Sequence, residues 1–187
     1  MVLYINYDVG MVCRKVLQEQ LDRLNLEYSI KGFGELEIKE TLSEAKLEQL
    51  NAGFNSYGIR IVEDQKSVLV QKIKSVLLEM IYSDEKLPSS KVSNYLVEKL
   101  NHSYGYISNL FSAVTYTSIE NFIILQRIER AKQLITAGEL SLTQICWKLQ
   151  YSSTAHFSNQ FKNVTGLTPT AFQRIITKRR EIVMSKE

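Results

Sequence analysis

Hydrophobic positions in the first sixty residues alternate between the period of a strand and the period of a helix. Strand-forming side chains alternate in four stretches, residues 2–7, 26–31, 33–39 and 58–62. The middle two meet at Gly32. Apolar residues at helical spacing run from Met11 to Leu24 and again after Ser43, a candidate N-cap. The order β-α-β-β-α-β predicts a ferredoxin-like α+β domain over residues 1–64.

The next segment, residues 67–82, has apolar side chains on more than one helical face. Such a helix must be buried on two sides, either within its own chain or against a second copy. The polar stretch after it, residues 84–90, contains Pro88 and predicts a domain boundary. We therefore expect a connecting helix and linker over residues 65–88.

Helical spacing continues from this linker toward the C-terminus. It predicts six helices, at residues 91–99, 104–114, 118–136, 141–149, 154–164 and 170–178. Gly138 is placed to end the long third helix, and Thr168 with Pro169 to begin the last one. The pattern predicts an all-α domain over residues 89–178, followed by a basic tail at 179–187.

A six-residue phrase occurs twice in this helical region. Residues 106–111 read Tyr-Ile-Ser-Asn-Leu-Phe, and residues 156–161 read His-Phe-Ser-Asn-Gln-Phe. Each copy follows a shorter apolar helix and a Ser-rich turn, which is the layout of a helix-turn-helix. In that motif the second helix enters the major groove of DNA and its outward residues touch base edges. The alternative is a pair of plain helical hairpins with solvated Ser and Asn side chains.

Charge divides the chain near the predicted linker. Residues 1–84 hold 10 Lys+Arg and 13 Asp+Glu, whereas residues 85–187 hold 13 and 7. This asymmetry predicts that only the C-terminal half meets a polyanion. The apolar runs are short, so we expect no membrane span and no signal peptide. Two cysteines in different predicted domains suit a reducing cytoplasm.

The second copy of the repeat carries the residues of a known signature. Residues 142–146 read Leu-x-x-Ile-Cys, residues 156–162 read His-Phe-Ser-x-x-Phe-Lys, and residues 166–169 read Gly-Leu-Thr-Pro. Residues 89–176 thereby resemble the AraC-type double helix-turn-helix DNA-binding domain. The resemblance implies two recognition helices, held by the long helix at 118–136, that enter successive major-groove faces about 34 Å apart.

The resemblance also implies which residues meet DNA. Asn can pair with adenine through two hydrogen bonds, and Ser or Thr can bond several bases. The implied contact positions are Gly105, Ser108, Asn109 and Ser112 in the first recognition helix and Thr154, Ala155, Ser158, Asn159 and Lys162 in the second. Lys162 and the basic run at 178–180 are implied as phosphate contacts. A solvated tail is the alternative interpretation of that run.

Two departures from the family pattern lie in the first copy. Ser112 stands where the family usually has Lys, and Tyr116 where it usually has Gly. Neither recognition helix contains Arg. Fewer cations release fewer counterions from DNA, so we predict a shallow salt dependence and a modest affinity for a lone monomer.

The N-terminal region is similar to a second family, the heavy-metal-associated domain. The similarity rests on Gly10, Met11, Val12 and Cys13 after the first predicted strand. That family holds a soft metal such as copper or zinc between two thiolates, but Val16 stands where the second cysteine would be. Cys13 is therefore a weak metal candidate. Its alternatives are a plain small residue, a thiol shared with a second chain, and a redox sensor.

Together these patterns predict a cytoplasmic transcription regulator rather than an enzyme. Both histidines, His102 and His156, lie at or beside the predicted recognition helices, and no catalytic triad or phosphate-binding Gly-rich loop stands out. Cys146 lies on an apolar helix face and is predicted to be a core residue. We expect double-stranded DNA as the partner, RNA polymerase as a further candidate, and a homodimer through the helix at 67–82. No resident cofactor is expected. The rival function is a thiol- or soft-metal-binding metallochaperone or sensor.

Overall fold

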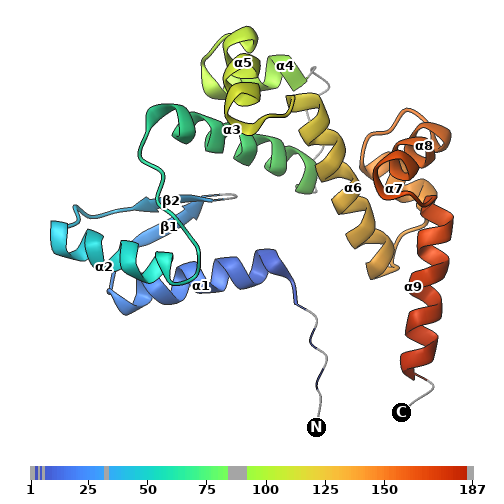
Figure 1. The fold of residues 1–187 in the computed structure, drawn as a ribbon, viewed down its shortest axis with the longest axis horizontal. Helices are drawn as coiled ribbons and strands as arrows, with labels where there is room; N and C mark the ends of the chain where they lie inside the picture. The colour runs from blue at the N-terminus through green and yellow to red at the C-terminus, as the bar shows by residue number, and fades with distance from the viewer. Residues whose placement is uncertain (1–2, 4, 6, 32–33, 84–91, 185–187) are drawn as a thin grey trace. The chain divides into compact units, whose positions relative to one another are not determined.

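The computed structural model describes residues 3, 5, 7–31, 34–83 and 92–184 of the 187-residue chain. Contacts divide the chain into two compact units, Met1–Ser75 and Val76–Glu187 (Figure 1). The predicted linker with Pro88 and the predicted junction at Gly32 lie outside the described residues. Among the helices that are described, none is long and apolar enough to cross a membrane.

The N-terminal unit combines two helices with a two-stranded hairpin. Its elements are α1 (Val9–Arg23), β1 (Tyr28–Lys31), β2 (Glu35–Ile38) and α2 (Glu44–Asn55). The strands are antiparallel, with Tyr28 opposite Ile38 and Lys31 opposite Glu35. α1 and α2 lie side by side (Figure 1). The core consists of four buried side chains, Leu21, Leu26, Leu50 and Phe54.

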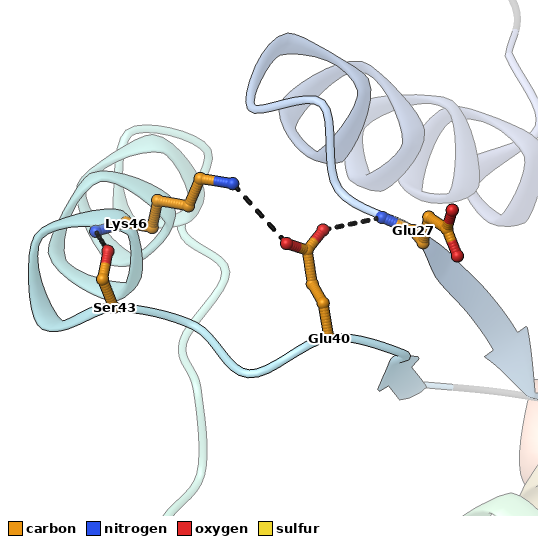
Figure 2. Close-up of polar contacts among 4 residues, drawn as sticks. All are labelled: Glu27, Glu40, Ser43 and Lys46. Atoms are coloured by element: carbon orange, nitrogen blue, oxygen red, sulfur yellow. Dashed lines mark hydrogen bonds and ion pairs between the residues drawn. The ribbon is translucent and has the colours of Figure 1, made fainter.

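The carboxylate of Glu40 holds the segment between the hairpin and α2 in place through two contacts. Glu40 follows β2, and its Oε1 accepts a hydrogen bond from the backbone N–H of Glu27 over 3.1 Å (Figure 2). The other oxygen of Glu40 lies 3.6 Å from the ammonium of Lys46 in α2. Ser43 Oγ accepts a hydrogen bond from the backbone N–H of Lys46 over 3.4 Å. Ser43 is therefore the N-cap of α2, which confirms the sequence prediction, whereas Gly53, where the sequence predicts this helix to stop, lies inside α2.

The described residues do not confirm the ferredoxin-like prediction for this unit. Two of the four expected strands form, and they make a two-stranded sheet within the described part of the chain. Leu3, Ile5 and Tyr7 lie outside any strand and are between 68% and 80% exposed. Residues 58–62 also form no strand. Alternation marks a segment that can become a strand, but a strand needs a neighbour to accept and donate its backbone hydrogen bonds.

The predicted long helix is confirmed as α3 (Gln65–Tyr82), which crosses the division between the units. Asp64 Oδ1 begins it by accepting hydrogen bonds from the backbone N–H groups of two residues of its first turn, each over 3.0 Å. Its buried stripe consists of Val70, Ile73, Leu77 and Met80. Ser75 is buried as well. The single chain already buries this stripe, and dimerisation through α3 stays a prediction.

The described residues of the C-terminal unit after α3 form helices and short turns. The helices are α4 (Val92–Leu100), α5 (Tyr104–Thr115), α6 (Ile119–Ala137), α7 (Leu142–Lys148), α8 (Thr154–Thr165) and α9 (Pro169–Met184). All six predicted helices are therefore confirmed. Gly138 is the left-handed C-cap of α6, and Thr168 Oγ1 accepts a hydrogen bond from the backbone N–H of Ala171 at the start of α9. α9 also continues into the predicted basic tail.

The long helix α6 forms the centre of this unit. It contacts α5, which precedes it in the sequence, and α7, α8 and α9, which follow it. Figure 1 shows α6 running between the pair α4 and α5 and the pair α7 and α8. One core of this unit joins Ile128 and Ile135 of α6 to Phe157 and Phe161 of α8. Cys146 is fully buried in this core, which confirms its prediction as a core residue, and burial raises the pKa of its thiol.

Candidate nucleic-acid interface

Two helix pairs in the C-terminal unit repeat the same local structure. Each pair begins with a short helix, α4 or α7, and continues through a turn into α5 or α8. Ser103 Oγ accepts a hydrogen bond from the backbone N–H of Tyr106 over 3.3 Å at the start of α5. Ser153 Oγ accepts one from the backbone N–H of His156 over 3.1 Å at the start of α8. The sequence repeat therefore starts both second helices with the same N-cap.

Matched aromatic contacts hold the inner faces of α5 and α8. Phe111 and Phe161 are completely buried. Phe111 meets Phe122 of α6 edge to face, with ring centroids 5.5 Å apart. Phe161 meets Phe172 of α9 in the same way, at 5.6 Å. Each pair locks its helix to the helix that follows it, so the same packing recurs in both copies.

The ends of α5 and α8 match as well. Thr115 Oγ1 and Thr165 Oγ1 each donate a hydrogen bond to the backbone carbonyl four residues earlier, over 2.7 Å and 2.8 Å. Both helices then end in a left-handed residue, Tyr116 with φ of 55° and Gly166 with φ of 78°. These shared caps, ring pairs and hydroxyl contacts show that the C-terminal unit holds two copies of one structural module.

The structure places most predicted DNA-contact residues on the outer faces of α5 and α8. The exposed ones are Gly105, Asn109, Ser112, Thr154, Ala155, Asn159 and Lys162. Ser108 and Ser158 are half-buried, and Ser108 Oγ donates to the backbone carbonyl of Gly105 over 3.3 Å. That hydrogen bond engages the hydroxyl of Ser108 within its own helix. The base contacts themselves stay predictions.

Two exposed rings on these faces are not among the predicted contact residues. Tyr106 lies 5.2 Å from the ring of His102, and His156 lies 5.4 Å from the ring of Tyr151. Tyr106 and His156 occupy the first position of the repeated phrase, one residue before a buried core position. Successive residues of a helix point in different directions, so the residue before a buried core position faces away from the core. This position in the repeated phrase is the sequence signal that could identify Tyr106 and His156 as exposed.

Two arginines of this unit contact other elements of the fold. Arg180 lies in the run predicted to contact phosphates or to form a solvated tail. It donates hydrogen bonds to the backbone carbonyls of Thr136 and Ala137 at the end of α6. The last carbonyl groups of a helix have no partner within the helix, so Arg180 supplies one. Arg127 lies over the ring of Tyr151, 5.9 Å from its centroid, and burial lowers the pKa of Arg127.

Lysine 162 provides the positive charge of the recognition helices. Lys162 is exposed on α8, and neither α5 nor α8 contains a second Lys or an Arg. The outer face of α5 is therefore uncharged, and the outer face of α8 has one cation. This difference means that the two modules can attract phosphates unequally.

Cys13, the metal candidate of the N-terminal unit, is an exposed residue of α1. Asp8 caps this helix by accepting a hydrogen bond from the backbone N–H of Met11 over 3.0 Å. Among the described residues, no group of three or more His, Cys, Asp or Glu side chains could hold a metal ion. Soft-metal binding by Cys13 stays a prediction, and metal analysis of the purified chain would test it.

Comparison with known sequences identifies the repeated modules. A family model for a helix-turn-helix domain matches residues 96–175. The chain is 33% identical over 88 residues to the Msm operon regulatory protein of Streptococcus mutans, a match that covers 47% of this chain and 32% of that protein. The chain spans about a third of the length of such curated relatives.

Solved structures share the fold of this region. A transcriptional regulator of Chromobacterium violaceum, described as containing an AraC-type DNA-binding domain, matches with a TM-score of 0.51 and 22% identity over 59% of this chain and 93% of that one. The DNA-binding domain of AdpA, solved with a target DNA, matches with a TM-score of 0.51 and 18% identity over 60% of this chain and 96% of that one. Residues 96–175 therefore match a helix-turn-helix domain, and the fold of this region is similar to that of a solved AraC-type DNA-binding domain.

Proposed function

We propose that this chain is a transcription regulator that binds specific sequences of double-stranded DNA. The doubled module carries the proposal. α5 and α8 are held alike on their inner faces and expose small polar side chains on their outer faces. A second helix of this kind can enter the major groove and touch base edges. The regulatory protein of Streptococcus mutans and the DNA complex of AdpA, which match this region, support the same function.

In this proposal, each module contributes one set of base contacts. Asn109 and Asn159 occupy the same position in α5 and α8, and each amide can form two hydrogen bonds with adenine. α6 has 19 residues and is about 28 Å long, which suits modules that enter the groove roughly one turn apart. Lys162 contacts a phosphate, which fixes the position of α8 without reading sequence.

The N-terminal unit is proposed to regulate DNA binding or to support dimerisation. Residues 1–84 carry more acidic than basic side chains, so we assign DNA contact to the C-terminal unit. Dimerisation through α3 and contact with RNA polymerase are further parts of the proposal. Sedimentation of the chain over a range of concentrations measures its oligomeric state, and a concentration-independent monomer would exclude the dimer.

Two substitutions on α8 test the assigned roles. Asn159→Ala removes a base contact and should relax specificity at one base pair, at a cost of about 1–3 kcal/mol. Lys162→Ala removes a phosphate contact, so it should weaken all sequences alike and reduce the salt slope by about one. Asn109→Ala is the matched variant in the first module and should relax specificity at a different base pair. Gel-shift titration at several salt concentrations measures these effects.

The DNA for these titrations comes from selection. The purified chain is used to enrich duplexes from a random pool, and the enriched sequence serves as the specific site. Equal losses for Asn159→Ala and Lys162→Ala on every sequence would contradict their assigned roles. Failure of the wild-type chain to enrich any sequence would contradict the proposed function.

A further inference from the structure

The exposed ring of His156 is held at two points at the start of α8. Its Nδ1 lies 3.2 Å from Oγ of Ser152. Its ring also meets the ring of Tyr151 edge to face, with centroids 5.4 Å apart and an angle of 81° between the planes. Tyr151 is only 3% exposed and belongs to the core of the second module. His156 is therefore an exposed side chain whose orientation is set by the core.

The two contacts also determine which ring nitrogen faces outward. Nδ1 is turned toward Ser152, the residue before the N-cap Ser153, so Nε2 is the nitrogen left for an outside partner. The N-terminus of a helix carries partial positive charge, which favours a lone pair on the nitrogen that faces it. In the tautomer that keeps this lone pair on Nδ1, Ser152 Oγ–H donates to Nδ1 and Nε2 carries the proton. In the charged imidazole both nitrogens carry protons, so Nε2–H is an outward donor in either state.

We propose that His156 reads one base of the DNA site by donating a hydrogen bond from Nε2–H to N7 of a purine in the major groove. This inference rests on the proposed DNA-binding function. His156 shares the exposed outer face of α8 with Ala155 and Asn159. Purine N7 is a hydrogen-bond acceptor on the major-groove edge of both adenine and guanine. A donor fixed by Ser152 and Tyr151 reaches it without ordering a flexible side chain on binding.

The matching position of the first module has different chemistry. Tyr106 stands there, and its ring lies 5.2 Å from that of His102 with a tilt of 43°. Its hydroxyl can donate or accept, whereas Nε2–H of His156, in the tautomer proposed above, only donates. The two modules therefore present different groups at equivalent positions, and the purine preference belongs to the second module.

The test uses the full chain and the DNA site enriched from the random pool. Each purine of that site is replaced singly by its 7-deaza analogue, which lacks N7, and affinities are measured for the wild type and for His156→Phe. Phe keeps a ring against Tyr151 but has no donor. At one purine, the wild type should lose about fivefold to tenfold in affinity, as expected for one hydrogen bond, and His156→Phe should lose nothing further. At every other purine the two proteins should respond alike.

Two further variants distinguish the loss of a base contact from a loss of folded structure. Ser152→Ala frees the ring of His156 and should reduce the penalty at the same purine, which a purely structural role would not do. Tyr106→Phe, the matched control in the first module, should leave the penalty at that purine unchanged. Thermal unfolding followed by circular dichroism shows whether each variant keeps the wild-type fold.

The outcomes distinguish this inference from the proposed function. An equal penalty for wild type and His156→Phe at every purine would overturn the role of His156 and leave DNA binding intact. A loss for His156→Phe that is the same on selected and unselected DNA would assign His156 to a phosphate and also overturn it. If no sequence is enriched, the proposed function and this inference fail together.

Discussion

Residue 116 shows how the two modules differ at a single position. Tyr116 has φ of 55°, in the left-handed region, where the second module ends in Gly166 with φ of 78°. A side chain in this region costs roughly 1–2 kcal/mol, which glycine avoids. Tyr116 is 94% exposed, so packing of its ring contributes little to offset this cost.

Tyr116→Gly should therefore stabilise the chain by about 1 kcal/mol. The gain is smaller than the full cost because glycine loses more backbone freedom on folding. Gly166→Ala is the matched control and should destabilise the chain by about the same amount. Urea unfolding measures both changes. A Tyr116→Gly variant no more stable than the wild type would show that the left-handed Tyr116 is not strained.

Helix ends are the residue-scale features that the sequence predicts best. Ser43, Gly138 and Thr168 are predicted as boundaries, and the structure confirms each one. A cap depends on one side chain and on backbone groups a few residues away, so it is encoded locally. Arg180, in contrast, reaches carbonyls 43 and 44 residues away, and no local pattern predicts that contact.

At the scale of elements, the helices are predicted more reliably than the strands. A helix forms its backbone hydrogen bonds within one segment, so periodicity is enough to locate it. Residues 2–7 and 58–62 have strand-like sequences, yet no strand forms among their described residues. β1 and β2 do form strands, because they are adjacent in the sequence and each provides the antiparallel hydrogen-bonding partner of the other.

One polar contact joins the first recognition helix to α6. The hydroxyl of Tyr104 donates to Glu120 Oε1 over 2.6 Å. This hydrogen bond lowers the pKa of Glu120, whereas burial, followed by the same bond, raises the pKa of Tyr104 to about 12. A carboxyl with a lowered folded pKa stabilises the fold above its unfolded value, which is 4.5 for Glu120. That contribution is lost as the pH falls through the lowered pKa.

Tyr104→Phe should therefore destabilise the chain near neutral pH, and its difference from the wild type should shrink as the pH falls below 4.5. Protonation of Glu120 weakens the bond in the wild type, so the two proteins converge. Urea midpoints across this pH range measure the effect. Tyr106→Phe, on the same helix, is the control and should show no such convergence. A difference that stays constant with pH would show that the contact with Glu120 is not its cause.

At the scale of the whole molecule, α6 fixes the distance between the two recognition helices. Both modules pack on this single helix, so the proposed DNA-binding function presents them to DNA together. Two modules joined by a rigid helix should require a set separation and rotation of their contact blocks along the duplex. The spacing of the DNA site is therefore a property of the tertiary structure.

Insertion of about five base pairs between the two contact blocks should lower affinity at least tenfold. Half a turn of DNA places the second block on the opposite face, where α8 cannot reach it. Gel-shift titration of the selected site with and without the insertion measures the loss. The same insertion placed outside both blocks is the control. Unchanged affinity after the central insertion would mean that the modules bind independently or that one of them binds alone.

The sequence by itself determined the helices of the C-terminal unit, two of their caps and the presence of two similar modules. These features depend on periodicity and on groups a few residues apart, so they can be read along the chain. Tertiary structure decided the rest. Among the described residues, the N-terminal segment gained no strand partner, and Arg180 met the end of α6. Each of these outcomes depends on groups that only folding brings together, or leaves apart.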